Sequence, residues 1–314
     1  MNIAVLGNPL SWYFSDLQRA AKLCNSNGAS DLNFTSLPFS TLQAKLKTTQ
    51  AGPILSAGQS LDIFDAILVR TMPPGSLEQV VFRMNALHLY ERAGGLVLNG
   101  ARAIEIAVDK YLSLGLLAEA GINVPETIVC QTAEEALEAF EALGGDVVLK
   151  PVFGGEGRGI TRVSDPALAI RAVRMLEQLE GIIYLQRFIP HDGSDIRVFV
   201  LGDKTFSMRR VNTNDWRTNI SLGGRGEPYD ADSSLIELAK RAAEICQADI
   251  AGVDILLDHS GEPVVLEVNA VPGWRGLTEV IGQDVGYEVA QYLIKRVQQQ
   301  ASSPSQLSTE SSTL

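Results

Sequence analysis

The chain has 314 residues, of which 46% are hydrophobic and 20% charged, a length and balance typical of two or three packed domains rather than of a disordered chain. Its formal net charge of −11 disfavours nucleic acid and anionic membranes as partners, because the phosphate contribution to such binding would be repulsive. No apolar run approaches the roughly 20 residues of a membrane span, and MNIAVLGNPL lacks the basic start and cleavage site of a signal peptide. We therefore expect a cytoplasmic protein.

The first hundred residues alternate between short apolar runs and segments with helical spacing. Strands and helices are expected at residues 3–7, 15–23, 66–69, 77–93 and 96–99. This order predicts an open α/β domain over residues 1–96. Gly7 is not followed by the G-x-G-x-x-G pattern of dinucleotide-binding folds, so we interpret the domain as a scaffold that contributes one wall of a cleft.

After residue 101 the pattern changes to numerous strands separated by fewer helices. Strands are expected at 127–130, 147–150, 182–186, 196–201, 253–257 and 264–268, and helices at 107–120, 134–143, 235–246 and 285–299. The final SSPSQLSTESSTL has almost no apolar content and predicts a disordered tail, which we place at 298–314.

The cysteines and histidines form no reactive or metal-binding pattern. Three cysteines occur, at Cys24, Cys130 and Cys246. Their odd number and lack of paired spacing argue against a disulfide framework or a zinc cluster, and we interpret them as small buried hydrophobic residues. His88, His191 and His259 lie outside the motifs, and we expect them to be structural or exposed rather than catalytic.

A lysine at the end of an expected strand leads directly into a glycine-rich loop. Lys150 is followed by PVFGGEGRGI, with four glycines in six positions from Gly154 to Gly159. Glycines let backbone N–H groups close on phosphate oxygens without obstruction by a Cβ, and a fixed ammonium group neutralises their charge. No Gly-Lys-Ser/Thr follows, so this is not a Walker A loop. An ordinary flexible hairpin is the alternative, and the lysine favours a phosphate site.

A hairpin is expected where GVDILLD and EPVVLEVN flank Ser260-Gly261. With the turn centred there, Asp254 lies opposite Glu267, and Asn269 follows on the same face. The other face would carry three apolar pairs, Val253–Val268, Ile255–Leu266 and Leu257–Val264. Opposed carboxylates repel unless a cation or proton lies between them, and these hard oxygen donors suit Mg²⁺ or Mn²⁺ bridging the phosphates of a nucleotide. A solvated polar face on an edge hairpin is the alternative.

A basic stretch runs against the acidic background of the chain. From Arg187 to Arg225 there are seven Lys or Arg residues and four Asp. The planar guanidinium group of arginine makes two-point contacts with carboxylates and phosphates, so several arginines between the two sites above would hold anionic substrates. Taken alone, such arginines are equally often surface salt-bridge partners.

Seven separated motifs, in this order, resemble an ATP-grasp ligase of the RimK-like branch, which adds L-glutamate to an acceptor: DK…GINVPET, VVLKPVFGGEGRGI, YLQRFIP, GSDIRVFVLGD, RRVNTNDWRTNISLGG, GVDIL and VVLEVNAVPGW. The resemblance covers about residues 97–297. It implies an α/β (α+β) fold class, with an N-terminal open α/β pre-ATP-grasp domain over 1–96 and a two-subdomain ATP-grasp fold over 97–297. The lid subdomain would span about 115–185 and the C-terminal subdomain about 186–297.

The resemblance also implies roles for the residues that match the motifs. Contacts to the nucleotide would come from Lys110, Lys150, Gly155, Gly157, Gln186, Arg187, Phe188, Ile189, Asp195, Arg217 and Asn219. Metal ligands would be Asp254, Glu267 and Asn269, and Arg197 and Arg210 would lie near the reacting groups. Relatives often have an acidic residue after the hinge glutamine, so Arg187 is expected to keep only a backbone contact.

The implied chemistry is an amide ligation through an acyl phosphate, with ATP and Mg²⁺ (or Mn²⁺), L-glutamate as the amine and a carboxylate on the acceptor. GNPLSWYFSDLQRAA is most similar to pterin-modifying members, so a pterin coenzyme ranks first as acceptor and a protein or carrier-protein tail next. Trp12, Tyr13 and Trp274 are candidates to stack on a flat ring, with plain packing as the alternative. Relatives are often dimers or tetramers, so a homo-oligomer stays open.

Two other functions stay open at this point. A non-catalytic ATP-binding protein would keep the glycine loop and lysines but lose the metal ligands, whereas Asp254, Glu267 and Asn269 are all present. A dinucleotide oxidoreductase would depend on the first βα unit, whose glycine fingerprint is missing.

Overall fold

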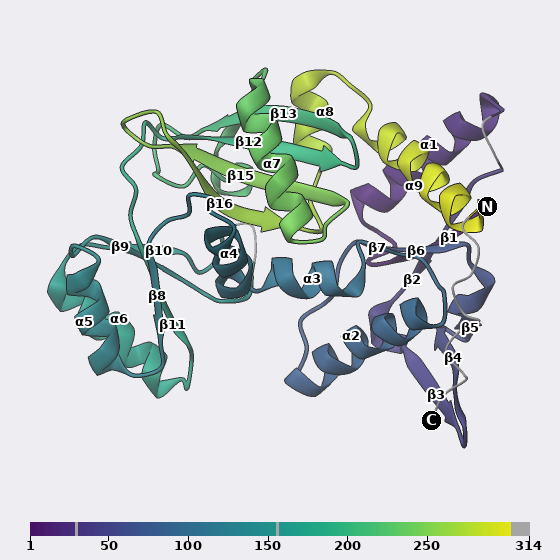
Figure 1. Cartoon of the computed structure of the whole chain (residues 1–314), viewed down its shortest axis with the longest axis horizontal. Helices are drawn as coiled ribbons and strands as arrows, with labels where there is room; N and C mark the ends of the chain where they lie inside the picture. Colours follow the sequence, from purple (N-terminus) through teal and green to yellow (C-terminus); the bar gives the residue numbers. More distant parts are fainter. Residues whose placement is uncertain (29–30, 155–156, 303–314) are drawn as a thin grey trace, which may run out of the picture. The chain divides into compact units, whose positions relative to one another are not determined.

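The computed structural model describes residues 1–28, 31–154 and 157–302. The chain divides into two compact units (Figure 1). The first contains Met1–Glu105, Ala248–Ile250 and the segment from Gly273 onward, and the second contains Ile106–Gln247 and Ala251–Pro272. Residues 273–297, which were expected within the ATP-grasp domain, thus cluster with the first unit. The chain passes from the first unit to the second within α3 (Ala101–Val108).

The first unit contains a four-stranded parallel sheet in the order β2-β1-β6-β7. Its strands are β1 (Asn2–Leu6), β2 (Asn33–Leu37), β6 (Ala66–Val69) and β7 (Val97–Leu98). Helices α1 (Trp12–Ser26) and α9 (Val285–Ser302) pack together on one side of the sheet, and α2 (Leu77–Arg92) covers the other (Figure 1). All residues of β6 are buried, as expected for a parallel strand covered on both faces.

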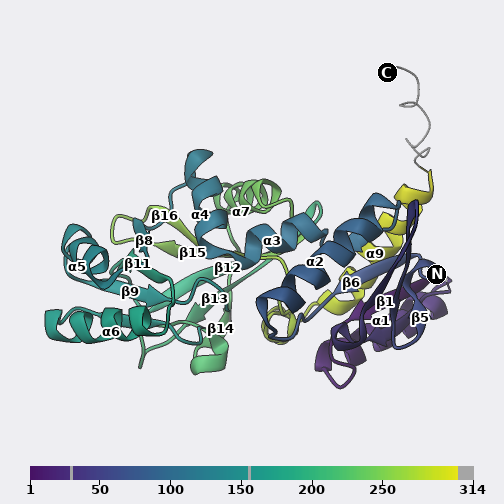
Figure 2. The same ribbon diagram turned by 90° about the horizontal axis from the view of Figure 1, so that it is seen from below.

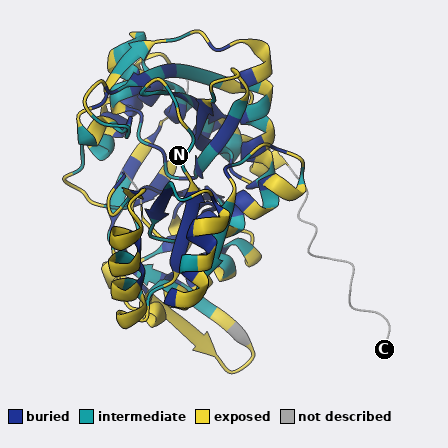
Figure 3. Cartoon of the chain, turned by 90° about the vertical axis from the view of Figure 1, so that its left-hand side faces the viewer, coloured by how far each residue is buried: buried dark blue, intermediate teal, exposed yellow. Residues whose placement is uncertain are grey.

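A small antiparallel sheet, β3-β4-β5, also belongs to the first unit. It consists of β3 (Gln43–Lys47), β4 (Gln50–Ser56) and β5 (Gln59–Ser60). The first unit also contains the helix α8 (Arg275–Ile281). The sequence predictions missed this sheet. Every residue of β3 is exposed (Figure 3), so it lacks the apolar alternation by which a half-buried strand is identified.

One part of the second unit is an antiparallel sheet in the order β10-β9-β11-β8, which we call the lid sheet because it lies in the segment expected to form the lid. Its strands are β8 (Thr127–Cys130), β9 (Val147–Lys150), β10 (Thr161–Val163) and β11 (Ile183–Arg187). One face packs on α5 (Ala133–Ala142) and α6 (Pro166–Gln178) around a core that includes Phe140 and Leu185 (Figure 2). The predictions missed α6, although Asp165 caps it and Pro166 opens it.

The remaining part of the second unit is a five-stranded sheet in the order β14-β13-β12-β15-β16. Its strands are β12 (Ser194–Leu201), β13 (Lys204–Val211), β14 (Arg225–Pro228), β15 (Ile250–Leu257) and β16 (Pro263–Asn269). Helices α4 (Lys110–Glu119) and α7 (Ser233–Ile245) pack against each other and against this sheet. Ile250, at the start of β15, clusters with the first unit.

Two expected helix boundaries were wrong. The helix predicted over 107–120 is two helices, because Asp109 caps the second one and accepts hydrogen bonds from the N–H groups of Tyr111 and Leu112. Helix α9 continues through Ser302, so the first five residues of the predicted tail at 298–314 are helical. Residues 303–314 lie outside the described residues. In the part of the chain that the structure describes, no helix is long and apolar enough to cross a membrane.

Candidate active site

A row of charged side chains crosses the five-stranded sheet. The hairpin of β12 and β13 pairs Asp195 with Arg210, and the hairpin of β15 and β16 pairs Asp254 with Glu267. Strand β12 neighbours β15, and Arg210 lies 2.8 Å from Asp254 between the two hairpins, so the four side chains form one row. The predicted opposition of Asp254 and Glu267 is confirmed.

Asp254 is bound by two arginines. Arg197 donates from Nε and Nη2 to Oδ1 and Oδ2 of Asp254, both at 2.7 Å, and Nη2 of Arg210 lies 2.8 Å from Oδ2. Burial opposes ionisation of Asp254, but the two guanidinium groups outweigh it and lower the pKa of the carboxyl group to about 2. Asp254 is therefore a carboxylate at neutral pH.

Arg210 and Asp195 form a second buried pair on the same row. Arg210 donates from Nε to Oδ1 of Asp195 at 2.7 Å and from Nη2 to Oδ2. Burial would lower the pKa of Arg210, yet Asp254 and Asp195 raise it above its ordinary value. Asp195, predicted in the nucleotide pocket, lines that pocket, but its carboxylate is occupied by Arg210. Its contribution there is to hold the arginine.

A β-bulge changes the predicted register next to the acidic pair. Up to Asp254 the register is as predicted, but Ile255 pairs with Val265 and Leu257 with Pro263, so the predicted pairs Ile255–Leu266 and Leu257–Val264 were wrong. The extra residue is Leu266, which lines the pocket beside Glu267 instead of the apolar face. Bulges re-aim side chains in this way next to active sites, and period-two alternation does not predict them.

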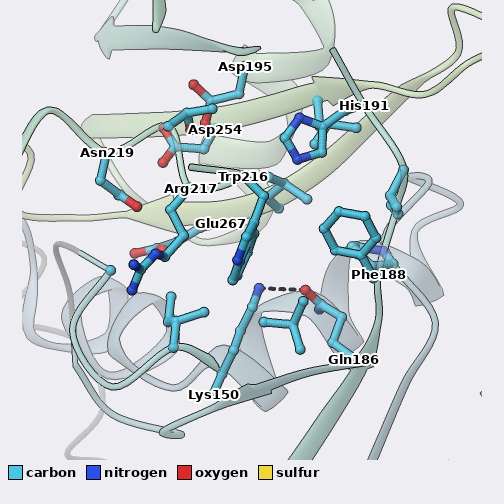
Figure 4. A pocket seen from close by; sticks show the side chains of 18 of the residues that line it. Lys150, Gln186, Phe188, His191, Asp195, Trp216, Arg217, Asn219, Asp254 and Glu267 are labelled. Carbon is cyan, nitrogen blue, oxygen red and sulfur yellow. Dashed lines mark hydrogen bonds between the residues drawn. The ribbon is translucent and has the colours of Figure 1, made fainter. Parts of the chain in front are cut away.

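Lys150 extends from the end of β9 into the same pocket. Its Nζ donates to Oε1 of Gln186 on β11 at 2.5 Å (Figure 4). Burial lowers the pKa of the Lys150 ammonium group to about 8, although Glu267 opposes the shift. Lys110 donates to the carbonyl of Gly154 at 2.5 Å, at the start of the glycine loop, and does not line the pocket.

The pocket is an open cleft between the lid sheet and the five-stranded sheet. Its charged side is formed by Lys150, Arg210, Arg217, Asp254 and Glu267 (Figure 4). Its other side is apolar and aromatic, formed by Val148, Ile160, Phe188, His191, Trp216 and Leu256. A slot with flat apolar walls beside a cationic end matches a base attached to phosphates.

The aromatic wall contains residues that sequence reasoning missed. Trp216 meets the Phe188 ring edge-on at 5.8 Å between centroids, and His191 lies 5.8 Å from Phe188. His191 was expected to be structural or exposed; it lines the pocket, and burial lowers its pKa. Two features of the sequence could have indicated these residues. His191 lies two positions after Ile189, and Trp216 lies within the motif DWRTN.

The expected hinge, Gln186 to Ile189, lines the pocket, but two of its N–H groups are already bonded. The N–H groups of Arg187 and Phe188 donate to the carbonyls of Glu126 and Asp146, at 2.8 and 3.0 Å. The Arg187 side chain forms an ion pair with Glu126 at 2.6 Å.

Gly157, in the glycine-rich segment, lies close to Asn219. Gly157 has φ +73°, and a Cβ there would lie 2.6 Å from Oδ1 of Asn219, so both conformation and space require glycine. Arg217 forms an ion pair with Asp215 at 2.6 Å at the rim of the pocket. Gly155, also predicted to contact nucleotide, lies outside the described residues.

Two further residues singled out from the sequence, Asn269 and Trp274, do not line the pocket. Asn269 accepts the N–H of Val271 at 2.8 Å and pairs with Gly252. Trp274 is fully buried in the first unit, where its Nε1 donates to Asp16 at 2.8 Å and its ring meets Tyr13 edge-on at 5.0 Å. Plain packing therefore explains Trp274 better than stacking on a ligand.

The sequence implies a divalent cation, and the carboxylate oxygens of Asp254 and Glu267 are its candidate ligands. Each carboxylate oxygen has two lone pairs, and Oδ1 of Asp254 accepts one hydrogen bond, from Arg197. Within residues 1–28, 31–154 and 157–302, the side chain of Glu267 makes no hydrogen bond or ion pair, and no three His, Cys, Asp or Glu residues cluster around a metal-sized site. The two carboxylates fit Mg²⁺ if phosphates and water complete the shell, as is usual for this ion.

Comparison with known proteins identifies the family. The model of the RimK-like ATP-grasp domain matches residues 107–293. Tetrahydromethanopterin:alpha-L-glutamate ligase of Methanosarcina acetivorans is 32% identical over 277 residues, covering 79% of this chain and 85% of that protein. Ribosomal protein bS6–L-glutamate ligase of Escherichia coli is 31% identical over 247 residues, covering 77% and 81%.

Solved structures agree with the sequence comparisons. The RimK domain protein ATP-grasp of Sphaerobacter thermophilus superposes with a TM-score of 0.70 at 26% identity, covering 93% of this chain and 99% of that one. The ATP-grasp ligase PsnB with its minimal precursor has a TM-score of 0.71 at 22% identity, covering 95% and 98%, which shows the shared fold. The chain therefore belongs to the RimK-like ATP-grasp family of ligases.

Proposed function

We propose that this protein joins L-glutamate to a carboxylate of an acceptor molecule at the expense of ATP. The observation that supports this most directly is the row of Arg210, Asp195, Asp254 and Glu267 facing Lys150 across one cleft. Such a row supplies both the cations that bind phosphates and the carboxylates that hold a divalent ion, as phosphoryl transfer requires. The similarity to glutamate ligases supports the identity of the amine.

The reaction follows from this arrangement. An oxygen of the acceptor carboxylate attacks the γ-phosphorus of ATP, the bond to the bridging oxygen breaks, and ADP leaves with an acyl phosphate behind. The glutamate amine then attacks the acyl carbon, and phosphate departs as the amide forms. Lys150 and Arg210 stabilise the charge on the phosphates, and the apolar wall around Phe188 positions the base.

Asp254 and Glu267 would hold Mg²⁺, with Arg197 fixing the orientation of Asp254. When bound, Mg²⁺ neutralises phosphate charge and polarises the phosphoryl oxygens. Arg197 and Arg210 reach the same carboxylate, so a substrate anion that draws one guanidinium away leaves the other on Asp254.

A pterin coenzyme is the first-ranked acceptor, with a protein or carrier-protein tail next. The similarity to the tetrahydromethanopterin ligase, which extends over 79% of this chain, supports the first rank. One relative is named as a ligase of L-glutamate and ribosomal protein bS6, and another as a ligase of alpha-aminoadipate and LysW, which supports the second rank.

The test incubates the protein with ATP, Mg²⁺, L-glutamate and each acceptor class separately, and follows ADP release together with the acceptor mass. Acceptor-dependent ADP release with the gain of one glutamyl residue supports the proposal. Tight ATP binding without turnover on any acceptor would favour the non-catalytic alternative. Membership of a ligase family removes the dinucleotide oxidoreductase considered from the sequence.

A further inference from the structure

The two faces of the lid sheet differ in chemistry. One face packs apolar side chains against α5 and α6. On the other face, the register places Gln186 directly opposite Thr127 of β8 and Tyr184 opposite Lys150 of β9. Side chains two residues apart on a strand share a face, and so do the members of a cross-strand pair. These four polar side chains therefore lie together on the face opposite the helices.

A chain of hydrogen bonds runs from Lys150 across this face. Nζ of Lys150 donates to Oε1 of Gln186 at 2.5 Å (Figure 4). Nε2 of Gln186 donates to Oγ1 of Thr127 at 3.0 Å and to the hydroxyl group of Tyr184 at 3.4 Å. The Thr127 hydroxyl group donates in turn to the carbonyl of Pro125 at 2.9 Å. The chain thus connects the lysine on β9 with the backbone just before β8.

The two ends of this chain fix its direction. An ammonium group only donates hydrogen bonds, and a backbone carbonyl only accepts them. Thr127 uses its single hydroxyl proton on the carbonyl of Pro125, so its oxygen can only accept from Gln186. The amide of Gln186 must therefore turn its NH₂ group toward Thr127 and its oxygen toward Lys150. An amide turned the other way would set its NH₂ group against the ammonium group.

Burial makes this orientation costly to lose. Gln186 is only 2% exposed, so water cannot easily replace a lost partner of its amide. The amide is also neutral, and it holds the Lys150 ammonium group without cancelling its charge. An ammonium group has three N–H groups. Gln186 takes one of them, and a bound anion can take the others.

We propose that Thr127 is a positioning residue for Lys150 and acts through the amide of Gln186. By selecting the amide orientation, Thr127 keeps an acceptor beside the ammonium group and so holds that group in the pocket with its full charge. The inference rests on the proposed function in taking the anion that Lys150 binds to be a phosphate of ATP. Gln186 then contributes to nucleotide binding through the lysine.

Two substitutions of Thr127 separate its hydroxyl group from its shape. Thr127→Val keeps the shape but removes the acceptor, so ATP affinity measured by calorimetry should fall about fivefold. Thr127→Ser keeps the hydroxyl group and should bind ATP like the wild type. Thr161→Val, at an exposed site on β10 of the same sheet, is the matched control. Wild-type affinity in Thr127→Val, or equal losses in the Ser and Val variants, would overturn the inference.

Steady-state kinetics should show the same separation. Lys150 would contact the phosphates both before and during transfer, so Thr127→Val should raise the KM for ATP and leave kcat unchanged. A variant that lowers kcat at an unchanged KM would contradict a role in holding the lysine for ATP binding.

A carboxylate at position 186 removes the need for an orientation. The two oxygens of the side chain in Gln186→Glu are equivalent, so either can face Lys150. In this background Thr127→Val should cause no further loss of ATP affinity, whereas in the wild-type background it should cost about fivefold. The same loss in both backgrounds would overturn the inference.

A measurement without nucleotide separates this inference from the proposed function. In ¹⁵N-lysine-labelled protein well below pH 8, where Lys150 is protonated, its bond to Gln186 should slow hydrogen exchange and keep its Nζ–H signal visible. The signal is assigned by its absence in Lys150→Met. We expect it in the wild type and in Thr127→Ser, and we expect its loss in Thr127→Val.

The two proposals can thus fail separately. A signal that persists in Thr127→Val would overturn the positioning role, even in a protein that ligates glutamate. The expected signals in a wild-type chain that does not bind ATP would refute the proposed function and would still support the positioning role of Thr127.

Discussion

The two large sheets of this protein gain their stability by different means. In the parallel sheet β2-β1-β6-β7, strand β6 is Ala-Ile-Leu-Val, and each side chain contributes by leaving water. In the five-stranded sheet, buried positions hold Asp195, Arg210 and Asp254, whose burial is costly unless every charge is paired. In the first sheet a truncated side chain costs stability through the volume that it leaves empty, whereas in the second a removed partner also leaves a buried charge unpaired.

The largest expected effect is on turnover. Glu267→Gln removes one negative charge from the proposed metal position while leaving the apolar core of the hairpin unchanged, so we expect activity to fall by a factor of about a thousand or more with an unchanged melting temperature. Turnover of glutamate ligation at saturating Mg²⁺ measures this. Glu262→Gln, on the exposed tip of the same hairpin, is the matched control. Wild-type rates in Glu267→Gln would contradict the metal assignment.

Breaking a charge pair should cost more stability than removing apolar volume. Asp254→Asn leaves Arg197 and Arg210 facing a neutral amide, and we expect the free energy of unfolding to fall by about 3–5 kcal/mol. Urea denaturation measures the change, with the exposed Asp230→Asn as control. An unchanged midpoint would show that the two arginines are satisfied without this carboxylate.

The parallel sheet provides the other side of the comparison. Ile67→Ala in β6 creates a cavity in the core of the first unit and should lower the free energy of unfolding by about 2–4 kcal/mol. Since no charge is orphaned, the ATP affinity of the folded fraction should stay at its wild-type value, as measured by calorimetry. Ile63→Ala, at an exposed site, should change neither quantity.

Lys150→Met should separate binding from stability. The variant loses a charge-assisted contact to phosphate, so ATP affinity should fall about tenfold to a hundredfold. The free energy of unfolding without nucleotide should rise by about 1 kcal/mol, because a buried ammonium group is replaced by an apolar side chain. Lys45→Met, on the exposed strand β3, controls for general charge effects. Unchanged nucleotide binding would remove Lys150 from the phosphate site.

The smallest effect is the pH dependence of that stability difference. The pKa of Lys150 is lowered to about 8 in the folded protein, so between pH 8 and its ordinary value of 10.5 the unfolded chain binds more protons than the folded one. Wild-type stability should therefore rise over this range, relative to Lys150→Met, and the advantage of about 1 kcal/mol that the variant has at neutral pH should disappear within about one unit above pH 8. A difference that stays constant from pH 7 to 10.5 would contradict the lowered pKa.

Sequence reasoning predicted best where one strand or one hairpin carries the signal. Period-two alternation placed Asp254 opposite Glu267, and a strand ending in lysine placed Lys150 in the pocket. It did not predict that Arg197 and Arg210 bind Asp254, because that contact joins two hairpins whose order in the sheet is not encoded locally. One clue was present: the two-residue turn Gly202-Asp203 sets Asp195 opposite Arg210.

The aromatic wall was missed for a related reason. Trp216 and His191 lie on irregular segments after β13 and β11, where periodicity gives no direction for a side chain. Their contacts with the Phe188 ring depend on how the lid sheet and the five-stranded sheet are arranged around the pocket. Such convergence is a property of the tertiary structure.

The bulge at Leu266 divides the β15–β16 hairpin into two segments that pair in different registers. Between Gly252 and Asp254 the strands keep one register, and beyond the bulge they follow a shifted register up to the turn. Residues added to or removed from the exposed turn near Ser260 would be absorbed on the far side of Leu266. This turn is accordingly a suitable insertion point for an epitope or a fluorescent reporter that leaves Asp254 and Glu267 in place.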